Sequence, residues 1–173
     1  SERKADGSTK QRFPDGTTRE TMADGSSRQR NPDGTMVERR ADGTQLTRSP
    51  HDGVEVVRGP DGRVQLSHPD GTVVERLADG RTVRTQPDGS REESKADGSV
   101  VVTRPDGSTK ERRTDGTIVE RDAASGTQVV TTPDGVEVET HLDGTTITRR
   151  PDSSSVRTDP DSGVQVVTAA DGR

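Results

Sequence analysis

Runs of about six residues, in which polar and apolar side chains roughly alternate, recur along this 173-residue chain between short glycine-containing triplets. We count each triplet as positions one to three of a nine-residue unit. Position six is then the most apolar, as at Val37, Leu46 and Val74, whereas position seven is often Glu and position eight is mostly Arg or Thr. Alternation with enrichment in Val and Thr predicts short β-strands. A Pro or Gly every few residues excludes helices.

The triplet is PDG or ADG, as in "NPDGT" at residues 31–35, and predicts where the chain reverses. Pro presets φ for the first corner of a type I turn, Asp accepts local backbone hydrogen bonds, and Gly supplies a positive φ. This combination is typical of a three-residue hairpin loop with a G1 bulge. The period is nine from Gly7 to Gly172, apart from ten-residue units near Pro50, Ala123 and Pro160. The spacing therefore predicts about 18 short strands in sequence order.

The same pattern argues against a closed interior. A solenoid would have to bury either the Arg or the Glu positions, which is costly without paired partners. In a hairpin array, position six faces position seven of the next strand and position eight faces position five. Each face then mixes Val with Glu and Arg, so two sheets have little reason to stack. We expect an all-β, elongated, single-layer antiparallel β-meander without a conventional core. Residues 1–173 form a single repeat array, expected to be a fragment of a longer protein, with an Ala-rich and a Pro-rich margin in its first half.

Composition sets limits on function. Only 22% of the residues are hydrophobic and 33% are charged, which is also typical of disordered segments, so a chain that folds only within an assembly is an alternative. The 26 basic and 31 acidic residues are mixed along the sequence, which predicts neither a nucleic-acid nor a membrane partner. The absence of Cys excludes disulfides and thiolate metal sites and fits a cytoplasmic location.

No residue pattern predicts catalysis. His51, His68 and His141 lie at or beside different turns, whereas a metal or catalytic site needs several groups at one point. The turn aspartates have a local role in their own turns. Glu at position seven and Arg at position eight are interpreted as solvated cross-strand ion pairs, and a flat sheet offers no pocket that could activate a nucleophile. We expect no catalytic, cofactor-binding or metal site, no cofactor, and no enzymatic activity.

The repeat resembles the T-complex 10 C-terminal (G-box) family. The matching residues are triplets such as "PDGT" at 14–17, 32–35 and 69–72, each followed by a charged, Thr- and Val-rich strand. The resemblance covers essentially the whole chain and implies a free-standing sheet, exposed on both faces, in a centriole-assembly protein. It also implies binding of a proline-rich segment of a partner and a tendency to self-associate. Aromatic residues are common in the family, whereas Phe13 is the only one here, so no ligand-binding residue is carried over.

Three functional hypotheses follow. The first is a non-enzymatic structural or scaffold module of a microtubule-based assembly, in the cytoskeleton of a centriole, basal body or cilium axoneme. It would dock other proteins of the assembly along its sheet. The second is a module that binds proline-rich peptides. The third is a self-assembling extracellular or surface fibre, built by pairing of the unpaired edges that the terminal strands expose.

Overall fold

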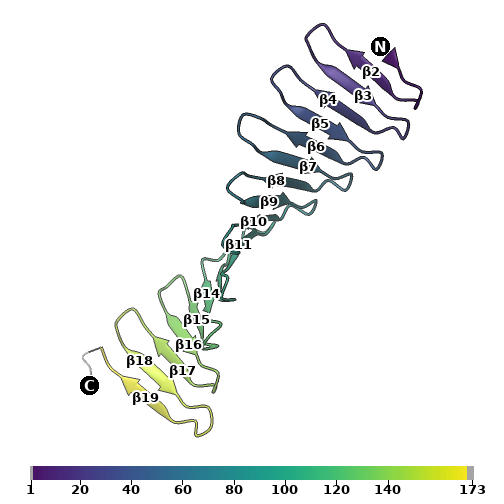
Figure 1. The fold of residues 1–173 in the computed structure, drawn as a ribbon. Helices are drawn as coiled ribbons and strands as arrows, with labels where there is room; N and C mark the ends of the chain where they lie inside the picture. The colour runs from purple at the N-terminus through teal and green to yellow at the C-terminus, as the bar shows by residue number, and fades with distance from the viewer. Residues whose placement is uncertain (1, 171–173) are drawn as a thin grey trace. The chain divides into compact units, whose positions relative to one another are not determined.

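The computed structural model describes residues 2–170, and the chain divides into two units, Ser1–Pro87 and Asp88–Arg173. In each unit, consecutive strands pair antiparallel with one another, and the strands form one layer (Figure 1). The strands of unit 1 are β1 (Glu2–Arg3), β2 (Thr9–Arg12), β3 (Thr18–Thr21), β4 (Ser27–Arg30), β5 (Met36–Arg39), β6 (Gln45–Arg48), β7 (Glu55–Arg58), β8 (Val64–Ser67), β9 (Val73–Arg76) and β10 (Thr82–Thr85). Those of unit 2 are β11 (Arg91–Ser94), β12 (Val100–Thr103), β13 (Thr109–Arg112), β14 (Ile118–Arg121), β15 (Gln128–Thr131), β16 (Glu137–Thr140), β17 (Thr146–Arg149), β18 (Ser155–Thr158) and β19 (Gln165–Thr168). The predicted all-β single-layer meander is confirmed.

The strands are shorter than the sequence predicts. From β2 onward each has four residues rather than six, because positions four and nine belong to the hairpin closure. In the turn before β6, Arg40 N–H donates to the Thr44 carbonyl at 2.8 Å and Gly43 N–H donates to the Arg40 carbonyl at 3.1 Å. Gly43 has φ 88°. This is the three-residue loop with a left-handed Gly that the triplet predicts.

The ten-residue units keep the register of the sheet. In the turn before β15, Gly126 N–H donates to the Asp122 carbonyl at 2.9 Å, so the loop itself takes up the extra residue. Arg121 of β14 still faces Gln128 of β15, which is the predicted pairing of position eight with position five. Because a shift of one residue would move every side chain to the other face, this accommodation preserves the two faces of the sheet.

No conventional core exists in residues 2–170. The buried hydrophobic side chains are Leu46, Val83 and Val119, all at position six, with 7%, 3% and 5% of their surface exposed. No described side chain falls below 2% exposure. Position six is therefore the best-buried apolar position, as its composition predicts. Cross-strand pairs, at about 0.2–1 kcal/mol each, and ladder hydrogen bonds must supply the stability of such a sheet.

The hydroxyl residue directly after the turn glycine is also buried, which sequence reasoning did not single out. Its N–H and often its hydroxyl donate to the turn aspartate. Ser8 N and Oγ lie 2.9 and 2.6 Å from Asp6 Oδ1, and the same pair of bonds joins Ser99 to Asp97. The recurrent "DGT" and "DGS" letters could have revealed this, because Asp commonly forms such Asx turns. The buried residues at this position are Ser8, Thr17, Thr72, Ser99, Ser108, Thr117 and Thr145.

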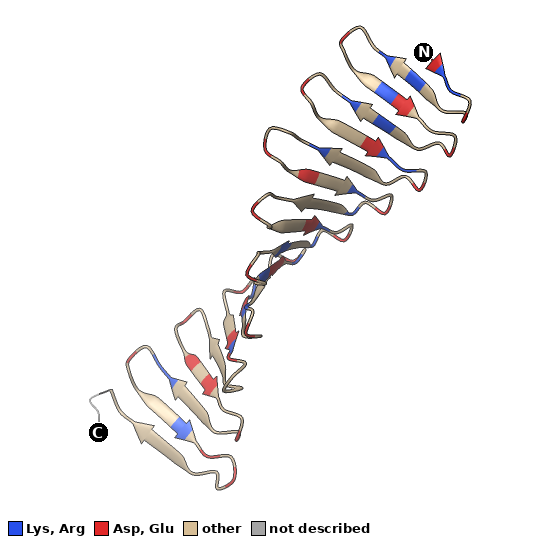
Figure 2. Ribbon diagram, in the orientation of Figure 1, with Lys and Arg blue, Asp and Glu red and all other residues tan. Residues whose placement is uncertain are grey.

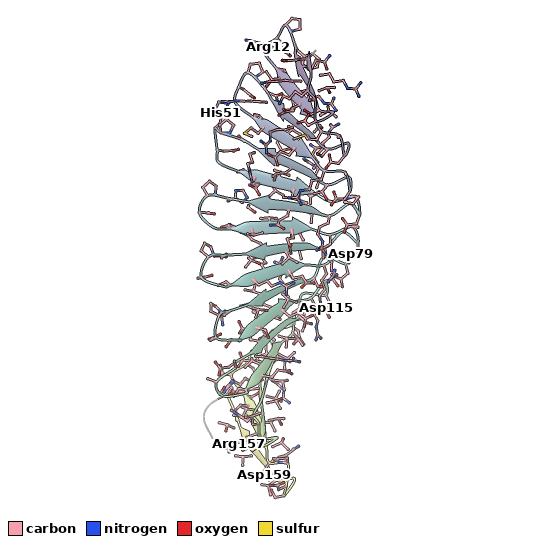
Figure 3. All side chains as sticks on the ribbon, turned by 45° about the vertical axis from the view of Figure 1, so that its right-hand side comes forward. Arg12, His51, Asp79, Asp115, Arg157 and Asp159 are labelled. Carbon is pink, nitrogen blue, oxygen red and sulfur yellow. The ribbon has the colours of Figure 1, made fainter. Side chains whose placement is uncertain are left out.

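Successive turns stack along each margin of the sheet. A Cβ placed on Gly34 would lie 3.1 Å from Cγ of Pro50, in the next turn of the same margin. On the opposite margin, a Cβ on Gly7 would lie 3.5 Å from Cβ of Ala23. In unit 1 one margin therefore carries proline rings and the other mostly alanines. His51 and Asp79 mark the two margins in Figure 3. The predicted difference between the margins is confirmed there.

Ser153 stands where other turns carry Gly, and it has φ 67°. Left-handed backbone costs an L-residue about 1–2 kcal/mol relative to glycine, so we expect Ser153→Gly to raise the free energy of unfolding by about 1 kcal/mol. Ser154→Gly is the matched control, because Ser154 has no positive φ, and it should lower stability instead. Denaturant unfolding followed by circular dichroism measures both. A loss of stability in Ser153→Gly would contradict the turn geometry.

Candidate functional site

The three histidines do not form a site. His51 and His68 lie in different turns of unit 1, and His141 lies in unit 2 beside Glu139, with Nε2 3.3 Å from Oε1. Within residues 2–170, no group of three or more His, Asp or Glu side chains could hold a metal ion. The same residues form no helix long and apolar enough to cross a lipid bilayer. That the protein has no catalytic, cofactor or metal site stays a prediction.

The turn aspartates have the local role that the sequence predicts. In the turn before β5, Asp33 Oδ1 accepts the N–H of Thr35 at 2.9 Å. This hydrogen bond and a second one from the Thr35 side chain hold the pKa of Asp33 below its usual value of 3.8. Asp97 shows the same lowering of its pKa, caused first by the Ser99 hydroxyl and then by the Ser99 N–H. The carboxylates at the margins (red in Figure 2) are therefore engaged with their own backbone.

The two faces of unit 1 differ in charge, although charges are mixed along the sequence. Directly paired residues and alternate residues of one strand share a face. All five glutamates of unit 1 lie on the same face, which we call the glutamate face. These residues are Glu2, Glu20, Glu38, Glu55 and Glu75.

The opposite side of unit 1, the arginine face, carries strand arginines and no acidic strand residue within β1–β10. Its arginines are Arg3, Arg19, Arg39, Arg58, Arg76 and Arg84. The expectation that each face mixes Glu with Arg is therefore wrong for the arginine face of unit 1. The reason is geometric. Side chains alternate between the faces, so in odd strands position seven, where Glu20, Glu38 and Glu75 stand, points to one face and position eight, with Arg39, Arg58 and Arg76, points to the other.

The ion pairs join strand residues that share a face, and not all of them combine the predicted positions seven and eight. Within one strand those positions point to opposite faces, whereas position seven of one strand and position eight of the next share a face. Glu38 of β5 instead pairs with Arg28 at position six of β4, at 2.9 Å. A pair of the predicted type is formed by Glu139 and Arg149 of unit 2, at 2.8 Å, and Arg149 also contacts Glu137 at 2.7 Å. Exposed pairs of this kind contribute little each.

Unit 2 also has two unlike faces. One carries the pairs formed by Arg149 and by Lys110, whose Nζ lies 2.8 Å from Glu120 Oε1. On the other face, β15–β19 present only uncharged strand residues. These are Gln128, Val130, Val138, Thr140, Thr146, Thr148, Val156, Thr158, Gln165 and Val167.

The sheet is not entirely flat. A shallow hollow of about 300 Å³ lies on the glutamate face beside Gly59, where position nine lacks a side chain. Its other lining residues are Thr44, Val57, Pro60, Asp61, Arg63 and Gln65. Hollows of about 260 and 350 Å³ elsewhere are lined mainly by charged side chains. The sequence predicted no pocket. At the first hollow the missing side chain of Gly59 leaves the depression, and the "RGPDGR" stretch at 58–63 could have signalled it.

Taken together, the described residues define an open, single-layer hairpin repeat with exposed faces, in which binding would occur on surfaces rather than in a cleft. Comparison with protein families finds a match for residues 60–94 with the T-complex protein 10 C-terminus. Comparison with curated proteins finds no match.

Solved structures with the same fold include the wild-type TCP10 domain of Danio rerio CPAP, 26% identical, with a TM-score of 0.82 over 95% of this chain and 96% of that one. The G-box domain of the microcephaly protein CPAP is 24% identical, with a TM-score of 0.85 over 89% and 99%. The SAS-4 (dCPAP) TCP domain of Drosophila melanogaster, in complex with a proline-rich motif of Ana2 (dSTIL), is 20% identical, with a TM-score of 0.50 over 92% and 89%. The resemblance predicted from the repeat is thus confirmed by the matched residues 60–94 and by the shared fold.

Proposed function

We propose that this chain is a non-enzymatic protein-binding module of a centriolar assembly, which docks extended segments of partner proteins on its open sheet. The observation that carries the proposal is the fold, shared along 95% of the chain with the TCP10 domain of Danio rerio CPAP. A related domain was solved with a proline-rich motif bound, and another structure is described as suggesting a role in centriole elongation. A cytoskeletal scaffold role, and a place in basal bodies or the cilium axoneme, extend the same proposal.

The hollow beside Gly59 is our candidate docking point for a proline-rich segment. Proline rings bind apolar surfaces in preformed grooves, and this hollow is bounded by Val57 and by the ring of Pro60. Asp61 and Arg63 also line this hollow, but charged side chains make up a larger part of the other two hollows. Phe13 is the only aromatic residue of the chain. We therefore expect this hollow to provide the apolar contact that aromatic side chains usually give to a proline-rich peptide.

Titration with a synthetic peptide carrying the Ana2 proline-rich motif tests the proposal. We expect saturable binding, lost when the prolines are replaced by alanine. Val57→Lys should weaken binding by roughly tenfold, because it places a charge in the hollow that the peptide cannot solvate. Val56→Lys is the matched control, since Val56 is the next residue of β7 and points to the opposite face. Absence of peptide binding by the wild-type chain would contradict the peptide-binding function. An equal loss of affinity in Val57→Lys and Val56→Lys would show that the peptide does not bind at the hollow.

A further inference from the structure

The strand arginines of the arginine face are not paired with an acidic strand residue of β1–β10. None of the six forms an ion pair with another residue of the described part of the chain. Their cross-strand neighbours are uncharged: Arg39 faces Ser27 and Gln45, and Arg58 faces Gln45 and Val64. Arg76 likewise lies between Val64 and Thr82. These guanidinium groups are therefore free to bind an external acid.

Three of these arginines form a regular row. Arg39, Arg58 and Arg76 occupy position eight of β5, β7 and β9, and all three are exposed. Neighbouring strands lie about 4.8 Å apart, so arginines on alternate strands are spaced by about 9.6 Å. Beside the row runs a second one made of half-buried apolar side chains, Val37, Val56, Leu66 and Val74, interrupted by Thr47.

The spacing of the row selects a conformation for the partner. A polyproline II segment rises about 3.1 Å per residue and has three residues per turn, so every third side chain points the same way at intervals of about 9.3 Å. An extended β-segment presents alternate residues instead, and residues three apart point to opposite sides. Carboxylates accept charge-assisted, bidentate hydrogen bonds from Arg. The remaining residues of the segment would lie on the apolar row.

We propose that the arginine face binds an acidic partner segment in the polyproline II conformation, with a carboxylate at every third residue, lying across strands β5–β9. Such a partner complements the one-signed charge of the strand residues on this face, where Arg39, Arg58 and Arg76 form no ion pair with a described residue. The proposal concerns the opposite face from the hollow beside Gly59, so it does not depend on the binding of a proline-rich segment there.

The test compares two peptides of equal length, (Glu-Pro-Pro)4 and (Gln-Pro-Pro)4, by calorimetric titration of the whole chain. The row variant carries Arg39→Gln, Arg58→Gln and Arg76→Gln. Glutamine suits this row, because Gln45 already stands between Arg39 and Arg58. We expect (Glu-Pro-Pro)4 to bind the wild type, to bind the row variant roughly tenfold more weakly, and to weaken as salt rises.

A matched control removes three arginines with the same spacing from the glutamate face. Arg12, Arg30 and Arg48 occupy position eight of β2, β4 and β6. They share their face with the glutamates of unit 1, and Arg48 pairs with Glu55 at 2.7 Å. Their replacement by Gln lowers the net charge by the same amount. It should leave the affinity for (Glu-Pro-Pro)4 within about twofold of wild type, since only nonspecific attraction changes. Circular dichroism of both variants checks that each keeps the β-sheet, which we expect because the replaced side chains are exposed.

Each outcome decides the matter. Equal loss in the row and control variants would show that net charge, not the arginine row, attracts the peptide, and would overturn the proposal. Equal binding of (Gln-Pro-Pro)4 and (Glu-Pro-Pro)4 would overturn it too, while leaving the docking of proline-rich segments intact. Tighter binding of single-stranded oligo-dT than of (Glu-Pro-Pro)4, lost in the row variant, would assign the face to nucleic acid and reject an acidic protein segment.

Discussion

Replacing Gly53 by alanine is expected to lower the free energy of unfolding by about 2–4 kcal/mol. Two costs add. Gly53 has φ +66°, which an L-residue adopts at a cost of about 1–2 kcal/mol. In addition, its Cβ would lie 2.8 Å from Cγ of Pro69 in the neighbouring turn. The Pro69 ring is rigid, so the stacked turns of the Pro-rich margin would have to separate.

Gly25→Ala separates these two costs. Gly25 has φ +84° and no atom within 4 Å of its added Cβ, so this variant bears the backbone cost alone and should lose only about 1–2 kcal/mol. In a Pro69→Ala background, Gly53→Ala should approach the same loss. Denaturant unfolding followed by far-ultraviolet circular dichroism suits a chain without Trp or Tyr. Equal destabilisation by Gly53→Ala and Gly25→Ala would mean that the turns of the margin do not support one another.

Acidification is expected to unfold the sheet through its turns. The pKa values of most turn aspartates are lowered from 3.8, chiefly by hydrogen bonds from the residue two positions on, as at Asp42, Asp97 and Asp115. A lowered folded-state pKa means that the unfolded chain binds protons first. The stability from these carboxylates is therefore fully present above their unfolded pKa and is lost as pH falls through the lower folded values. Many turns titrate together, so the thermal midpoint should fall steeply below pH about 4.

Salt distinguishes this cause from general charge repulsion. At low pH the 26 Lys and Arg side chains stay charged, and their mutual repulsion would be screened at about 1 M salt. Loss of the local Asx hydrogen bonds would not be screened. We therefore expect the acid transition, followed by circular dichroism during thermal unfolding from pH 7 to about pH 2, to persist at high salt. A midpoint independent of pH, or one fully restored by salt, would argue against the turn carboxylates as the cause.

The two binding predictions differ from the predictions about turn stability and acid unfolding. Each concerns a surface formed by side chains of several neighbouring repeats. The hollow beside Gly59 arises from one missing side chain among similar units. The row of Arg39, Arg58 and Arg76 arises from three strands. Both could be located only after the register was known, since a shift of one residue would have moved each side chain to the other face.

The local structure of this protein was predictable from its sequence because the residues that form each turn lie within the same nine-residue unit. Asp42, Gly43 and Thr44 illustrate this: the Asp oxygen accepts the Thr N–H at 2.8 Å, and the Gly takes the left-handed φ, without help from distant residues. The hairpins, their nine-residue spacing, the antiparallel order and the lack of a conventional core all followed from such short-range rules. The strand length was overestimated, because the residues flanking the triplet serve the turn.

The tertiary structure alone decided how the charges are arranged. Glu38 and Arg39 are adjacent along the chain, yet they lie on opposite faces, and Glu38 contacts Arg28 of the preceding strand. Arg39 is left on the arginine face beside uncharged neighbours. The physical reason is that a strand alternates its side chains between two faces while each hairpin reverses its direction. Which charges meet therefore depends on the parity and register of many strands, which no single repeat contains.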